Sequence, residues 1–182
     1  MPAPGVPEAP LRDTGEGLVP DGEGWFVVNA REARWRDGAP LGRVCFFEAG
    51  SEFTRLGINV SVLDPGQPMA MYHYENEQED FLVVSGRALL VVEGEERPLE
   101  TWDLAHCPPG TQHVIVGSGD GPCVIVAVGS RTGEEDWGAY TVDPAATRHG
   151  AGVDVETTSP AEAYARFPDG RFRRYREGWL PN

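Results

Sequence analysis

Residues 66–117 read GQPMAMYHYENEQEDFLVVSGRALLVVEGEERPLETWDLAHCPPGTQHVIVG, and this stretch holds three of the chain's four histidines. Short apolar runs, rich in valine, leucine and aromatic residues, alternate in it with turn residues, a pattern typical of antiparallel strands. Ser85-Gly86, Glu93-Gly94 and Pro109-Gly110 fall between these runs, and glycine supplies the positive φ that hairpin turns need. The stretch therefore predicts a succession of hairpins.

The same pattern continues on both sides of this stretch. In residues 56–63, Leu56, Ile58, Val60 and Val62 alternate with small or polar residues, which is the period of a half-buried strand. We expect nine strands, at residues 25–28, 44–47, 56–63, 69–74, 81–84, 88–92, 103–107, 113–116 and 123–128. So many short strands predict an all-β fold, an antiparallel barrel or sandwich.

The two ends of the chain differ from this strand-rich middle. Residues 1–24 hold five prolines among glycines and acidic residues and predict an extended arm before the barrel of residues 25–129. Residues 130–182 form a C-terminal extension. Short helices are expected at 30–35 and at 160–166, where Ser159 would cap the helix and Glu162 would complete a capping box.

Composition narrows the class of protein. The chain has 182 residues, which fits one domain, and its formal charge of -14 would repel nucleic acids and anionic membrane surfaces. Three cysteines without a CxxC pair predict no disulfide framework. No apolar run is long enough for a membrane span and no leader pattern is seen, so we expect a soluble, cytoplasmic protein.

Four polar residues of the central stretch are expected to converge. His73 and Glu75 lie two apart on one predicted strand and so share a face, and a hairpin brings Glu79 beside them. His113 opens a later strand after a proline-glycine turn. Two imidazoles and two carboxylates would then meet inside the barrel. Apolar residues of the same strands are expected to line the pocket beside them: Phe81, Val83 and Ile115.

The spacing of these residues resembles that of the cupin superfamily. The first cupin motif reads Gly, five residues, His, one, His, three or four, Glu, six, Gly, and His73, Glu75, Glu79 and Gly86 occupy the last four marked positions, with Gly66 one residue early. The second motif reads Gly, five, Pro, one, Gly, two, His, three, Asn. Its positions are held by Trp102, Pro108, Gly110, His113 and Gly117. The resemblance implies a double-stranded β-helix, a small jelly-roll barrel.

The resemblance also implies a metal site. In the family the two His, the Glu and the late His bind a divalent ion, which implies His73, Glu79 and His113 as ligands here. Glu75 replaces the second His and inherits only its position, where a carboxylate is competent to bind a divalent ion as a fourth ligand. Fe(II) or Mn(II) is favoured, and Zn(II) or Ni(II) also fits this ligand set. The alternative is a degenerate pocket whose polar groups bond to one another or to water.

The other candidate groups have simpler interpretations. His106 would face away from the site as a structural or interface histidine, Cys107 would be a small core residue, and His149 would be exposed in a loop. The alternating basic and aromatic residues at 171–176 could stack on nucleic acid. The acidic charge instead favours a tail that packs its aromatic residues, Phe172, Tyr175 and Trp179, on the barrel.

The superfamily is too diverse in function for the fold to name a substrate. We expect a metal-dependent enzyme, dioxygenase-like, that acts on a small organic molecule in the barrel mouth. A non-catalytic small-molecule or sugar-binding cupin, a sugar isomerase or epimerase, and a structural dimerisation module remain alternatives. We also expect a homodimer, because cupin barrels commonly pair and the arm could reach a second copy.

Overall fold

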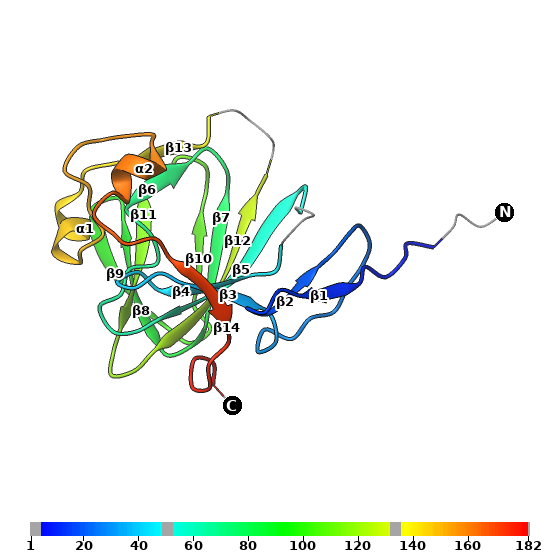
Figure 1. Cartoon of the computed structure of the whole chain (residues 1–182). Coiled ribbons are helices and arrows are strands. Elements are labelled where there is room, and N and C mark those ends of the chain that lie inside the picture. Colours follow the sequence, from blue (N-terminus) through cyan, green and yellow to red (C-terminus); the bar gives the residue numbers. More distant parts are fainter. Residues whose placement is uncertain (1–4, 49–52, 132–135, 182) are drawn as a thin grey trace.

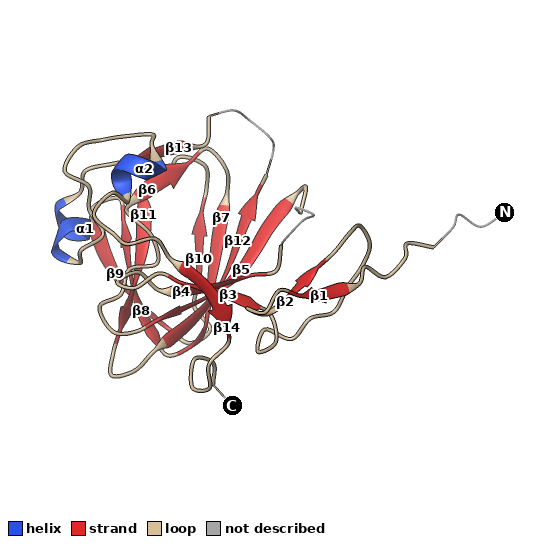
Figure 2. Cartoon of the chain, viewed as in Figure 1, coloured by secondary structure: helices blue, strands red, loops and turns tan. Residues whose placement is uncertain are grey.

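The computed structural model of the chain describes residues 5–48, 53–131 and 136–181. Two antiparallel sheets face each other as a barrel, with two short helices at one end (Figures 1 and 2). The larger sheet has the order β10-β7-β12-β5-β4-β3-β14, with strands Leu104–Cys107, Glu79–Ser85, Cys123–Ser130, Leu56–Leu63, Arg43–Phe46, Arg34–Asp37 and Arg171–Arg174. The smaller sheet has the order β13-β6-β11-β8-β9, with strands Gly138–Tyr140, His73–Glu75, His113–Ser118, Arg87–Val92 and Glu95–Glu100. This is the double-stranded β-helix that the sequence predicts.

The core lies between the two sheets. Val83 of β7 and Ile125 of β12 are fully buried there, opposite Ile115 of β11 from the smaller sheet. Gly86 and Gly94 have the predicted positive φ, +77° at each. Gly94 closes the expected hairpin between β8 and β9, whereas Gly86 connects β7 to β8 of the other sheet and closes no hairpin. A side chain at Gly86 would also place its Cβ 2.6 Å from the Pro122 carbonyl oxygen, so glycine is needed there for space as well as for conformation.

The N-terminal segment folds back on itself, which differs from the expected extended arm. Strands β1 (Leu11–Asp13) and β2 (Leu18–Pro20) form a hairpin that stands out from the side of the barrel (Figure 1). Val19 is buried, and Leu18 beside it bridges to Ala33 at the start of the barrel. Residues 25–28 form no strand either; Trp25 makes a single bridge to Glu8, and Val27 is 78% exposed.

The predicted helix at 30–35 is wrong. A turn at residues 30–32 is held by the Asn29 side chain, which accepts a hydrogen bond from the Arg31 backbone N–H, and strand β3 follows at Arg34. Extended backbone is favoured because Trp35 pairs with Cys45 of β4 and is fully buried on the outer face of the larger sheet. Tertiary pairing thus overrides the local pattern.

The C-terminal extension is part of the sheets. Strand β14 pairs with β3, and β13 pairs with β6, so residues after 129 complete both sheets rather than only packing on them. The expected packing of Tyr175 and Trp179 is confirmed, because their rings lie 6.2 and 5.4 Å from that of Trp35. Phe172, in contrast, is 42% exposed beneath the guanidinium of Arg34.

Two short helices follow β13. Helix α1 (Pro144–Arg148) was not expected, and helix α2 (Pro160–Ala163) is the core of the one predicted at 160–166. As expected, the Ser159 side chain accepts a hydrogen bond from the Glu162 N–H. Within the described ranges, no helix is long and apolar enough to cross a membrane.

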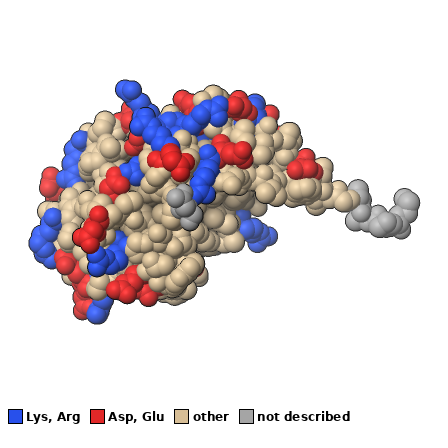
Figure 3. Space-filling view, turned by 90° about the horizontal axis from the view of Figure 1, so that it is seen from below, with Lys and Arg blue, Asp and Glu red and all other residues tan. Residues whose placement is uncertain are grey.

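Acidic and basic side chains lie next to one another on the face shown in Figure 3. Two ion pairs anchor β14: Arg173 lies 3.3 Å from Asp37, and Arg174 lies 2.8 Å from Asp13 of the N-terminal hairpin. The arginines of this tail therefore meet the protein's own carboxylates, as the acidic composition suggests.

Candidate metal centre

Three of the four predicted ligands converge where the two sheets meet at one end of the barrel. His73 lies on β6, His113 is its direct partner on β11, and Glu79 begins β7 of the other sheet. One potential ligand atom from each of these residues lies within 4.8 Å of the other two. The Glu79 Oε2 atom lies 3.2 Å from His113 Nε2 and 3.7 Å from His73 Nε2. The motif residues therefore form one cluster.

Both imidazoles are oriented by backbone carbonyl groups. His73 Nδ1 lies 2.7 Å from the Met71 carbonyl oxygen, and His113 Nδ1 lies 2.9 Å from that of Thr111. A carbonyl oxygen only accepts hydrogen bonds, so each Nδ1 carries the hydrogen and each Nε2 is left to face the cluster. Such outer contacts are typical of metal-binding histidines.

Two buried atoms of the cluster lack hydrogen bonds within the described part of the chain. They are Glu79 Oε2 and His113 Nε2, whose contact lacks hydrogen-bond geometry. An unsatisfied buried polar atom is costly, and a cation placed between a carboxylate oxygen and an imidazole nitrogen would satisfy both. The donor set therefore fits a divalent ion.

The charges of the cluster are strongly coupled in the metal-free protein. Burial alone would raise the pKa of Glu79, but the imidazoles of His113 and His73 outweigh it and lower that pKa to about 2. Burial alone would lower the pKa of His113, yet the side chains of Cys107 and Glu79 raise it to about 10. Without a metal, a proton on His113 therefore takes the place of the cation.

Glu75 lies beside the cluster rather than within it. Its Oε1 atom is 3.8 Å from His73 Nε2, and the three-residue cluster does not include it. Burial, and then the charge of Glu79, raise its pKa. The geometry brings Glu75 to the same cavity without showing it to be the fourth ligand that its position in the motif suggests.

The cluster opens into a cavity of about 650 Å³. Phe81 and Ile115 line it, as the sequence predicts, and the Phe81 ring centroid lies 5.2 Å from that of His113. The prediction that Val83 lines the cavity is wrong. Val83 lies two residues after Phe81 on β7, is fully buried in the core and is not among the lining residues. The inward face of a strand passes from the cavity into the packed core within two residues.

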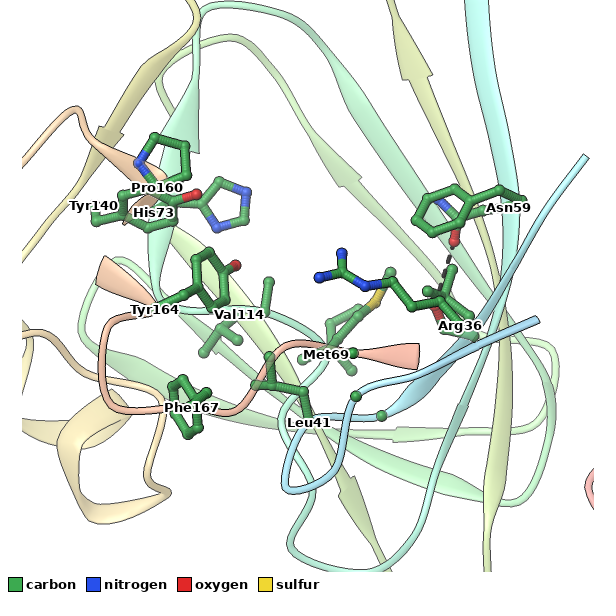
Figure 4. Close-up of a pocket in the computed structure, with 18 of the residues that line it drawn as sticks. Arg36, Leu41, Asn59, Met69, His73, Val114, Tyr140, Pro160, Tyr164 and Phe167 are labelled. Atoms are coloured by element: carbon green, nitrogen blue, oxygen red, sulfur yellow. Dashed lines mark hydrogen bonds between the residues drawn. The ribbon is translucent and has the colours of Figure 1, made fainter. Parts of the chain in front are cut away.

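Several lining residues come from elements without a motif. Tyr140 of β13 pairs in register with His73, and Tyr164 follows helix α2 with its ring centroid 5.5 Å from that of Tyr140. Arg36 of β3 enters from the opposite wall (Figure 4). No signal in the sequence marked these three residues, because the strands that place them depend on long-range pairing.

The remaining histidines and Cys107 lie outside the cluster. His106 is exposed, with its Nδ1 atom 2.6 Å from Asp80, which agrees with a structural role. Cys107 is buried in the core, as expected. His149 is not simply exposed: its Nε2 atom lies 3.0 Å from Glu96, a carboxylate distant in sequence.

Comparison with known proteins agrees with this architecture. Residues 59–129 match the cupin domain family. The chain belongs to the cupin superfamily. These residues include both motifs and all three clustered side chains. No curated protein matches the chain.

Solved cupin structures resemble this chain in fold. A sugar phosphate isomerase from Silicibacter pomeroyi is 20% identical, with a TM-score of 0.53 over 85% of this chain and 96% of that one. A protein from Thermotoga maritima described as a predicted oxalate decarboxylase is 18% identical, with a TM-score of 0.51 over 58% of this chain and 98% of that one. A candidate sugar phosphate isomerase from Acidithiobacillus ferrooxidans is 26% identical, with a TM-score of 0.42, and the match covers 47% of this cupin and only 54% of that protein. At these identities the first two establish the fold and not the reaction.

Proposed function

We propose that this cupin is a metal-dependent enzyme that binds one divalent ion through His73, Glu79 and His113 and acts on a small organic molecule in the adjoining cavity. The observation that carries the proposal is the pair of buried atoms, Glu79 Oε2 and His113 Nε2, that lie 3.2 Å apart without hydrogen bonds in residues that line that cavity. In a purely structural site each of these atoms would have its own hydrogen-bond partner, whereas here a proton on His113 takes the position that a divalent ion would occupy.

The ligand set suits a catalytic ion better than a structural one. Two imidazoles and one carboxylate leave coordination positions open, whereas structural zinc favours a closed shell of thiolates and imidazoles. This set supports Fe(II) first and Mn(II) next, with Zn(II) and Ni(II) compatible. When bound, such an ion would supply Lewis acidity and, if redox-active, chemistry with O₂.

The protein's own residues would position the substrate and control protons. Phe81 and Ile115 give the inner cavity an apolar wall that limits access of water. Burial and the adjacent Tyr164 hydroxyl raise the pKa of Tyr140, so its hydroxyl keeps its hydrogen, for which a substrate oxygen in the cavity would compete with Tyr164. These features support a substrate with an apolar body and at least one oxygen that faces His73.

The test combines metal analysis with an activity screen. The purified protein is loaded anaerobically with Fe(II), then mixed with catechols, β-diketones and small keto acids while an oxygen electrode follows O₂. The proposal expects consumption with one class by the wild type and the His106→Ala control, and loss in His113→Ala. If the loaded protein consumes no O₂ with any class but binds sugars tightly by calorimetry, the binding-cupin alternative replaces the proposal.

Homodimer formation belongs to the proposal as well. The hairpin of β1 and β2 projects from the side of the barrel (Figure 1). Leu104 of the edge strand β10 is exposed, and so is Trp102 just before that strand. Light scattering at micromolar concentration should report twice the mass of the chain, and a monomer would contradict this part.

A further inference from the structure

Arg36 lines the cavity and places a positive charge on its solvent-exposed side. Figure 4 shows its side chain entering from β3, with the guanidinium group directed toward the centre of the cavity and toward the wall that carries His73 and Tyr164. Burial raises the pKa of the Tyr164 hydroxyl on that wall, and the charge of Arg36 is one of the effects that offset part of this rise. Arg36 thus faces the metal centre from the other side of the same space.

No ion pair within the described residues involves this guanidinium. Its neighbours on the adjoining strands behave differently: Arg173 pairs with Asp37, Arg174 with Asp13, and Arg43 with Asp64. Asp169 also lines the cavity, yet no contact within ion-pair distance joins it to Arg36. The guanidinium group of Arg36 therefore lines a ligand-sized cavity without an ion-pair partner among the described residues, and a ligand can bind to it.

The fold makes room for this side chain at Gly170. A Cβ built at Gly170 would lie 2.6 Å from Arg36 Nε and 3.1 Å from its Cγ. Gly170 does not have a positive φ, so its backbone does not require glycine. The missing side chain at position 170 is therefore what lets Arg36 lie where it does.

We infer that Arg36 binds the carboxylate of an organic acid whose other end faces the His73–Glu79–His113 centre. A guanidinium group presents parallel N–H donors that match a carboxylate. The apolar side chains of Leu41 and Met69 line the same cavity and would contact the aliphatic or aromatic body of the acid. A dianionic phosphate fits less well, because the cavity offers one arginine and also carries Glu75 and Asp169. The inference rests on the proposed function, since it takes this cavity to be the substrate site.

The experiment compares ligands of one shape that differ in charge. 4-Methylpentanoate, its primary amide and 3-methylbutyl phosphate are titrated calorimetrically into metal-loaded and metal-free protein at pH 7.5. The wild type should bind the acid about ten- to a hundredfold more tightly than the amide, as expected for charge-assisted hydrogen bonds. Arg36→Gln should abolish the preference without changing metal content, and Arg36→Lys should restore part of it.

Two further variants distinguish the effect of the position of Arg36 from the effect of the protein's overall charge. Arg171→Gln removes an exposed arginine on β14 outside the cavity and should keep the full preference for the acid. Gly170→Ala should reduce the preference while leaving the guanidinium in the protein, because the new methyl group displaces Arg36. Equal binding of acid and amide by the wild type, or a preference that survives in Arg36→Gln, would overturn the inference.

The outcomes also distinguish this inference from the proposed function. If the protein binds no metal but the metal-free form prefers the acid through Arg36, the carboxylate site stands and the metal proposal fails. If the protein binds metal but binds the acid and the amide with equal affinity, the metal proposal stands and the carboxylate site fails. Tighter binding of the phosphate than of the acid would overturn the carboxylate assignment in favour of a phosphorylated substrate.

Discussion

His73 and His113 are direct partners in the register of β6 and β11, and their ring centroids lie 5.0 Å apart although forty residues separate them in the chain. Strand pairing alone therefore brings the two imidazoles together. Glu79 from the opposite sheet completes the cluster, so the site lies on strands rather than on loops and is held rigidly.

Removal of one imidazole tests the ligand assignment in solution. His113→Ala should lower metal affinity more than tenfold, because it removes one of three ligands, and it should leave the β-sheet circular dichroism signal in place. The measurement is metal per protein after dialysis against a limiting chelator. His106→Ala, at an exposed histidine outside the cluster, is the matched control and should retain full stoichiometry; equal metal in both variants would contradict the assignment.

Substitution of the two glutamates near the centre should affect metal binding differently. Glu79→Gln should lose metal as His113→Ala does, whereas Glu75→Gln should keep it, because Glu75 lies outside the three-residue cluster. Glu75→His should also fold and bind metal, since it restores the commoner family residue. Loss of metal in Glu75→Gln would show that Glu75 is a fourth ligand.

Protonation of His113 in metal-free protein depends on Glu79. The side chains of Cys107 and Glu79 raise the pKa of His113 to about 10, so its charged form stabilises the fold fully below pH 6.5, and this contribution is lost as pH rises through 10. Glu79→Gln should therefore bring the pKa down toward its ordinary value and lower stability near neutral pH. Imidazole ¹⁵N chemical shifts of chelator-treated protein measure this, and an unchanged pKa in Glu79→Gln would be inconsistent with the coupling.

Trp102 has an unfavourable backbone conformation. Its φ of 79° is one that residues other than glycine rarely adopt, and its side chain is 72% exposed, so little packing offsets the strain. Trp102→Gly should raise the free energy of unfolding by about 0.5–1 kcal/mol. Urea denaturation measures it, with Trp25→Gly as control: Trp25 is exposed without a positive φ, and its replacement should not stabilise the protein.

The C-terminal tail should contribute measurably to stability through Trp179. Its ring packs edge-on against Trp35, and the Arg43 guanidinium lies 5.3 Å from its centroid. Because the ring is only partly buried, Trp179→Ala should cost about 2 kcal/mol, less than the loss of a core tryptophan. Phe172→Ala, at an exposed ring of the same tail, should cost under about 1 kcal/mol by the same denaturation assay. Equal costs would show that the tail does not pack as described.

The sequence predicts much of the fold because local spacing determines it. The spacing of His73, Glu79 and His113 marks them as one candidate site, but the hairpin expected to bring Glu79 beside His73 and Glu75 does not form, because β6 and β7 belong to different sheets. The pairing of β6 with β11 and the approach of the two sheets bring these three residues together. Trp102 illustrates what the motif adds: it replaces the leading glycine of the second motif and has a positive φ, a conformation that glycine adopts readily.

The rest could not be predicted because it depends on pairing between distant segments. Arg36 lies in RWRD, a charged tetrapeptide that becomes a strand only between β4 and β14. Tyr140 reaches the cavity because β13 joins β6 across sixty residues of sequence. Strand β9, EERPLE, is charged and contains proline, so its pattern does not indicate a strand.

Anomalous diffraction from crystals grown with Mn(II) tests the central claim most directly. The account predicts one strong peak in each chain, within coordination distance of His73 Nε2, Glu79 Oε2 and His113 Nε2. A cavity without a peak, or a peak only at the pair of His149 and Glu96, would contradict the assignment of a metal centre to this barrel.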